Sequence, residues 1–160
     1  MKTFFFMLFF FLLICSFTQQ EDNKTFNLDK AKIDGISLNK ISKEDIVSKF
    51  GKPIRVTLDT NEFTGENFYM YYYNGISFEV SESGKSFPDE ISSTEIAINY
   101  SGKLIQIGND IIELQKEFPQ YDFNLSEGQV SILIRNTTAS YLQIYIVNRR
   151  IKGISFTENY

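Results

Sequence analysis

The sequence predicts an exported α+β domain in which short helices pack on a mostly antiparallel meander sheet. Three observations support this prediction. An apolar segment opens the chain, two short runs carry helix caps and stop signals, and most other apolar residues alternate with polar ones, as in half-buried strands. The 160 residues are 42% hydrophobic and 22% charged, which is enough apolar material for one compact domain.

The composition excludes several classes of chemistry. The chain has no histidine, no tryptophan and a single cysteine, Cys15. Histidine triads, Cys–His pairs, the common zinc sites and dithiol redox motifs all need side chains that are missing. With 16 basic and 20 acidic residues the net charge is −4, which is unfavourable for nucleic-acid binding. We therefore expect a non-enzymatic protein with no catalytic residue, metal or cofactor.

Residues 1–18 have the pattern of a signal peptide. Lys2 provides the positive start, and Phe4–Ile14 is an uninterrupted apolar run. This length suits a signal-peptide core of about 7 to 15 residues and is short for a membrane span of roughly 20. Cleavage after Thr18 would leave a polar tether over 19–32. We expect the protein to be exported to a periplasm, an outer envelope or the medium.

Cys15 has two interpretations. Leu12-Leu13-Ile14-Cys15 resembles a bacterial lipobox, whose cysteine is lipidated and anchors the mature protein to a membrane. Lipoboxes favour Gly, Ala or Ser where Ile14 stands, which favours a cysteine removed with the signal peptide. Membrane association is expected only through this residue.

The folded domain is predicted to occupy 33–160, and its first helix begins near Ser42. Ser42 is an N-cap with Asp45 at the third helical position, a weak capping box. Gly51 suits the left-handed position that ends a helix, and Pro53 cannot continue one. Three apolar side chains are expected to share one face: Ile46, Val47 and Phe50.

A β-hairpin is the most specific local signal. Two β-rich runs, 68–73 and 76–80, flank Asn74-Gly75, which predicts a two-residue turn with positive φ at both positions. The core face then carries three cross-strand pairs: Tyr73–Ile76, Tyr71–Phe78 and Tyr69–Val80.

The other face of this hairpin breaks the usual alternation of apolar and polar faces. Phe68, Met70 and Tyr72 are apolar where the second strand presents Ser77 and Glu79. Left open, these side chains would form a patch suited to binding another protein. The alternative is that the loop 81–86 or the tether covers them.

The second half of the chain also predicts a short helix and alternating strands. A strand should place Ile96, Ile98 and Tyr100 inward, and a helix should start near Asn109 or Asp110 and end at Pro119. Two or three strands follow, with inward side chains on each: Val130, Ile132 and Ile134, then Leu142, Ile144 and Ile146, then Ile154 and Phe156. A three-residue turn, 148–150, is expected because it pairs Ile144 with Ile154, and Tyr141 and Tyr145 then join the open face.

The two halves share the sequence Gly-Ile-Ser-Phe, at 75–78 and 153–156. Either one helix-and-meander unit is used twice, over 33–100 and 104–156, or the chain is a single irregular α+β domain.

The run Ile41–Pro53 followed by the Tyr-rich hairpin resembles SmpA/OmlA-type envelope lipoproteins and the tandem-repeat β-lactamase inhibitory proteins. The resemblance covers about 33–100, and more faintly 104–156. It implies short helices on an antiparallel meander and a non-enzymatic role in binding another protein.

Three functions follow from these patterns. The first is a protein-binding or envelope-associated module that uses the open face of its sheet, with five contact residues: Phe68, Met70, Tyr72, Tyr141 and Tyr145. The second is an inhibitor or immunity-type protein that inserts the loop Asp59–Glu66 into a secreted enzyme. The third is a hydrolase that uses two facing carboxylates, drawn from Glu62, Glu66, Glu79 and Glu82. The partner is expected to be another protein.

Overall fold

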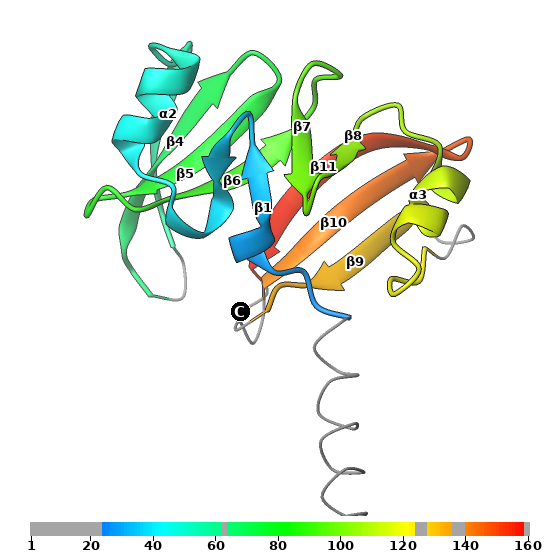
Figure 1. The fold of residues 1–160 in the computed structure, drawn as a ribbon. Coiled ribbons are helices and arrows are strands. Elements are labelled where there is room, and N and C mark those ends of the chain that lie inside the picture. The colour runs from blue at the N-terminus through cyan, green and yellow to red at the C-terminus, as the bar shows by residue number, and fades with distance from the viewer. Residues whose placement is uncertain (1–23, 62–63, 124–127, 136–139, 159–160) are drawn as a thin grey trace, which may run out of the picture.

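The structure, a computed structural model, describes residues 24–61, 64–123, 128–135 and 140–158. Within these residues it has two short α-helices and eleven strands in two antiparallel sheets, which confirms the α+β prediction (Figure 1). The large sheet has the strand order β3-β4-β5-β6-β11-β10-β9, and the small sheet has the order β2-β1-β7-β8.

The N-terminal elements are the 3₁₀ turn η1 (Leu28–Lys30), β1 (Ala31–Ile33), β2 (Ile36–Ser37), the 3₁₀ turn η2 (Leu38–Lys40) and helix α2 (Lys43–Phe50). The first meander consists of β3 (Arg55–Thr60), β4 (Asn67–Tyr73), β5 (Ile76–Ser81) and β6 (Ser86–Ile91). The remaining elements are β7 (Ala97–Tyr100), β8 (Lys103–Gln106), helix α3 (Ile111–Glu117), β9 (Gln129–Leu133), β10 (Ser140–Val147) and β11 (Arg150–Glu158).

The β4–β5 hairpin has the predicted register, with Tyr73 opposite Ile76 and Tyr71 opposite Phe78. Its turn differs from the prediction, because only Gly75 has positive φ, at 79°, and Asn74 does not. The carbonyl of Gly75 accepts hydrogen bonds from the N–H groups of Ser92 and Ser93. The turn therefore docks against a segment distant in sequence, and local turn preference alone does not set its conformation.

The β10–β11 hairpin corrects the predicted three-residue turn. Its turn has two residues, Asn148 and Arg149, both at positive φ. The predicted pair Ile144–Ile154 forms nevertheless, because a β-bulge at Lys152 shifts the register. Ile151 and Ile154 are both fully buried although three residues apart. A regular strand cannot turn both inward, and the extra residue lets it do so.

Helix α2 has the predicted capping box. The Ser42 hydroxyl accepts from the Asp45 N–H, and the Asp45 carboxylate accepts from the Ser42 N–H. Hydrogen bonding from Ser42 holds the pKa of Asp45 below its ordinary value of 3.8. Ile46 is fully buried, whereas Val47 is 39% exposed, so the predicted inward position of Val47 is wrong. Only one side of this helix touches the sheet.

Helix α3 begins where the sequence predicts. Asp110 is its N-cap and accepts a hydrogen bond from the Ile112 N–H, which lowers the pKa of Asp110, as does the Arg149 guanidinium 3.2 Å from the carboxylate. Ile111 and Leu114 of this helix are buried, and so is Phe118, which follows its last residue. Figure 1 shows α3 near β9 and β10, at the opposite end of the large sheet from α2.

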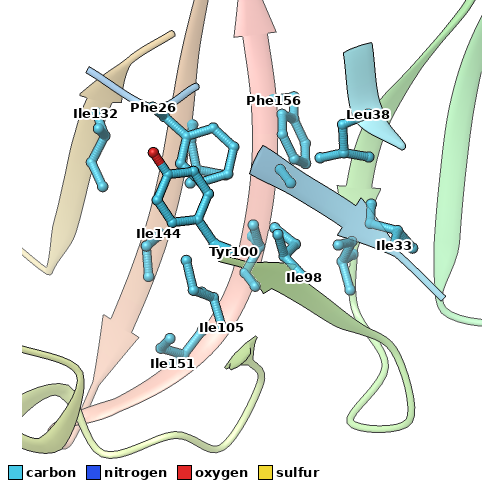
Figure 2. Packing of buried hydrophobic residues seen from close by; sticks show 14 of the residues in the cluster. Phe26, Ile33, Leu38, Ile98, Tyr100, Ile105, Ile132, Ile144, Ile151 and Phe156 are labelled. Carbon is cyan, nitrogen blue, oxygen red and sulfur yellow. The ribbon is translucent and has the colours of Figure 1, made fainter. Parts of the chain in front are cut away.

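One hydrophobic core lies between the two sheets and the helices. Ile33 and Ile98 from the small sheet face Ile144 and Phe156 from the large one, as Figure 2 shows. The predicted inward residues Ile96, Ile98 and Tyr100 are all buried. Phe50 of α2 contacts the rings of Tyr73 and Phe78, so this helix lies on the same side of the large sheet as the small sheet.

The described part of the predicted tether belongs to the fold. Phe26 is fully buried, stacks on Tyr100 with 4.6 Å between ring centroids, and pairs with Ile134 beside β9. A single aromatic residue within a polar stretch was not enough to predict this from sequence. The signal peptide 1–18 and Cys15 lie outside the described residues. In the described ranges no helix is long and apolar enough to span a membrane.

The two halves have a similar but unequal order of elements. The first has hairpin β1–β2, helix α2 and strands β3–β6, and the second has hairpin β7–β8, helix α3 and, in the described ranges, only three further strands, β9–β11. The hairpins join through β1 and β7, and the meanders join through β6 and β11. A small-sheet hairpin precedes each helix, and the second of these hairpins opens at Ala97. The use of one unit twice, over 33–100 and 104–156, stays a prediction.

Candidate partner-binding face

The candidate site is the open face, the side of the large sheet that points away from the small sheet. Side chains alternate along each strand, so the residues between the buried ones point to this side. Helix α2 and the small sheet both pack on the core side, where Phe50, Ile98 and Ile33 are found. The turn 81–86 bonds instead to residues 41–43, beside α2. The loop 81–86 therefore does not lie over the open face, and neither does the described part of the tether, whose Phe26 is buried in the core.

The first group on this face is Phe68, Met70 and Tyr72, on β4. All three side chains are half-buried, because they lie between two neighbouring strands and not under another layer. The Arg55 guanidinium lies 3.9 Å from the centroid of the Tyr72 ring, a cation–π contact. Met70 lies opposite Thr57 on one side and Glu79 on the other. The apolar side chains of this first group are therefore flanked by polar and charged side chains on the neighbouring strands.

The second group is Tyr141 and Tyr145, on β10. Tyr145 is 39% exposed and its hydroxyl donates to the Gln143 side chain at 2.9 Å. Its ring lies beside Gly153, where an added Cβ would be 3.5 Å from the ring. Tyr141 is half-buried opposite Thr157.

The structure places the two groups on one face but does not bring them together. Strands β5, β6 and β11 separate β4 from β10, which at the usual strand spacing is about 19 Å. The intervening surface is polar and acidic. The Ser77 hydroxyl donates to Asp89 at 2.7 Å, and Glu79 and Glu90 are exposed. A partner that spans both groups would therefore meet carboxylates at the centre.

A second apolar surface, on β3, was not predicted as a site. Val56 is 45% exposed and Leu58 is 60% exposed, and Ile54, just before the strand, is 76% exposed. The neighbouring Tyr69 is 38% exposed, which corrects its predicted core position. The core under α2 does not reach this edge of the sheet. The alternation of Val56 and Leu58 directly after Pro53 was the available sequence signal.

The other two functions depend on carboxylates and on the loop Asp59–Glu66. They contain no group of three acidic or cysteine side chains placed to hold a metal ion. The carboxylates of the predicted set lie on different elements: Glu66 at a hairpin end, Glu79 on the open face and Glu82 in the 81–84 turn. In the loop Asp59–Glu66, the side chain of Asn61 accepts the Thr64 N–H at 3.0 Å. Glu62 of the carboxylate set lies outside the described residues.

Among the surface pockets lined by described residues, two lie away from the open face. The larger, about 580 Å³, has Leu38 and Phe87 in its lining and Lys40 and Lys85 beside them. The smaller, about 370 Å³, is lined by residues including Tyr100 and Phe118. 

Near the smaller pocket, the Tyr121 hydroxyl donates to the Thr25 carbonyl at 3.2 Å and lies 3.4 Å from the Tyr100 hydroxyl. Burial and the Tyr100 contact raise the pKa of Tyr121. A raised phenol pKa keeps Tyr121 neutral, which suits a structural hydrogen bond and not a general base at neutral pH.

No protein-family model and no curated protein matches the chain. One solved structure is similar, an extracellular protein containing a SCP domain from Bacillus anthracis str. Ames, at 14% identity and a TM-score of 0.43. The alignment covers 75% of this chain and 44% of that chain, so this chain spans less than half of its length.

Proposed function

We propose that this chain is an exported, non-enzymatic module that binds another protein through the open face of its large sheet. The observation that carries the proposal is the first group, Phe68, Met70 and Tyr72, on a face that neither α2 nor the small sheet covers. Aromatic residues and methionine are enriched at protein interfaces, where they supply large contact areas. The pattern of residues 1–18 supports export.

The charge on the open face specifies the chemistry of the partner. Glu79 and Glu90 are exposed on the strands between the two aromatic groups, and the chain carries a net charge of −4. A complementary partner surface presents Lys or Arg at its centre and apolar side chains on either side. Such complementarity favours encounter and excludes acidic competitors.

The experiment compares partner capture by matched variants. Tagged protein expressed from the full sequence in its own host is cross-linked, purified and analysed for bound proteins. Tyr72→Glu places a charge within the first group, and we expect it to lower capture of the partner at least about tenfold, as at a binding hot spot. The control is Leu104→Glu on β8, which changes a side chain that is 49% exposed on the small sheet.

The proposal is supported if Tyr72→Glu loses a basic partner that Leu104→Glu retains, with circular dichroism showing both variants folded. It is refuted if the two variants capture the same proteins in the same amounts. It is also refuted if the captured partner binds through the Asp59–Glu66 loop, which would favour the inhibitor function.

A further inference from the structure

Strand β3 is a free edge of the large sheet. It lies at the end of the strand order and pairs with β4 alone among the described strands. Five of its six residues are exposed, including Val56 and Leu58. Soluble proteins usually protect such an edge with a short strand, a bulge or a covering segment, because free backbone groups pair with other chains.

The direction of the free backbone groups follows from the β3–β4 ladder. The Asn61 N–H donates to the Glu66 carbonyl at 2.8 Å, in register with the strand pairs. Because these groups alternate in direction along a strand, Thr57 directs its N–H and C=O toward β4, whereas Val56 and Leu58 direct theirs outward. The Thr60 N–H, also on the outward side, bonds to the side chain of Asp59 at 2.8 Å.

We propose that β3 pairs antiparallel with β3 of a second copy of this chain, with the two Thr57 residues opposite each other on a twofold axis. In this register Val56 lies opposite Leu58 of the second copy, and each such pair exchanges two backbone hydrogen bonds. Arg55 lies opposite Asp59 of the second copy. Both interactions occur twice.

The side chains of β3 fit this register and no neighbouring one. Arg55 and Asp59 are both exposed, and neither forms an ion pair with any described residue. A shift of two residues in one direction puts Asp59 opposite Thr57, and a shift in the other puts Arg55 opposite Thr57. Either shift removes both charge pairs. Opposite charges placed directly across a ladder stabilise it, and like charges destabilise it.

The same register covers the apolar side of the edge. Val56 and Leu58 lie on one side of β3 and are 45% and 60% exposed. Pairing places each beside the other from the second copy and removes part of both from water. The two large sheets then become one continuous sheet. Both copies of the first group, Phe68, Met70 and Tyr72, lie on the same face of it, one on each side of the paired β3 strands.

The first test is the oligomeric state and its dependence on charge. Protein expressed from the full sequence is examined by sedimentation equilibrium from micromolar to near-millimolar concentration, and we expect a reversible dimer. R55D and D59R each place like charges opposite each other twice, and we expect each to weaken dimerisation about tenfold or more. The double variant R55D/D59R restores opposite charges and should recover the dimer. Lys32→Asp on β1 makes the same charge change as R55D, but on the small sheet, and is the control for that variant.

The second test reads the register directly. Two Thr57 residues on the axis form a non-hydrogen-bonded pair, in which opposing cysteines are close enough to form a disulfide. Thr57→Cys should therefore give a covalent dimer on oxidation, while Thr60→Cys, which lies opposite residue 54 of the second copy, should not. A monomer at every concentration, a double variant that stays monomeric, or equal cross-linking of both cysteine variants would overturn the proposal.

Discussion

Replacing Gly75 with alanine should destabilise this fold more than the same change at another turn glycine. Gly75 has φ of +79°, and a Cβ added there would lie 2.1 Å from the Cβ of Ser93 and 3.1 Å from its Cα. Carbon atoms in ordinary contact are about 3.5 to 4.0 Å apart, so Ser93 must move by about 1.5 Å. The movement disturbs the hydrogen bonds that the N–H groups of Ser92 and Ser93 donate to the Gly75 carbonyl, at 2.9 and 3.2 Å.

The size of the effect follows from two contributions. A side chain in the left-handed region costs about 1 to 2 kcal/mol. Overpacking against backbone costs about 1 to 3 kcal/mol more. We therefore expect Gly75→Ala to lower the free energy of unfolding by about 2 to 5 kcal/mol, a large share of the stability of a small domain.

Gly102→Ala is the matched control. Gly102 also occupies the second position of a two-residue turn, with φ of +87°, but an added Cβ would meet nothing within 4 Å. This variant carries the conformational cost alone. Urea denaturation at 25 °C measures the free energy of unfolding of both variants, provided that the dependence of this free energy on urea concentration has the same slope in each. Equal losses for the two variants, within about 0.5 kcal/mol, would refute the close approach of the 92–93 segment to the turn.

Two further predictions concern the α2 cap and a buried tyrosine. Ser42→Ala should lower the free energy of unfolding by about 1 kcal/mol. Hydrogen bonding from Ser42 lowers the pKa of Asp45 below 3.8 in the folded protein. The stability difference between wild type and Asp45→Asn should therefore be present above about pH 4 and vanish as the pH falls through the folded pKa. Burial raises the pKa of Tyr121 above its ordinary value of 10, so its contribution is complete below pH 10 and declines at higher pH as the unfolded chain ionises. Tyr121→Phe should flatten this alkaline decline in urea denaturation, and an unchanged decline would show that Tyr121 is not buried.

Part of the candidate site could be predicted from the sequence. The faces of β4 and β10 follow from alternation alone, so Tyr72 and Tyr145 are on the side opposite the core, as expected. Their separation could not be predicted, because it depends on which strands lie between them. That order is set by the pairing of β6 with β11, two strands distant in the chain. Whether these residues bind a partner stays a prediction.

The sequence by itself determined the local elements. Ser42 and Asp45 start α2, Asp110 starts α3, and the β4–β5 register follows from a two-residue turn. These features depend on hydrogen bonds and side-chain alternation within a few residues, so no distant segment is needed to specify them.

Only the tertiary structure decided the rest. The Lys152 bulge, the burial of Phe26 and the docking of Ser93 on Gly75 each arise from contact with a distant part of the chain. The exposure of Leu58 was also decided by the tertiary structure. A strand with alternating apolar residues has the same sequence pattern at the centre and at the edge of a sheet. The physical reason is that apolar burial is non-directional. It specifies which side chains leave water, while the packing of the whole chain decides which strands meet and which edge stays free.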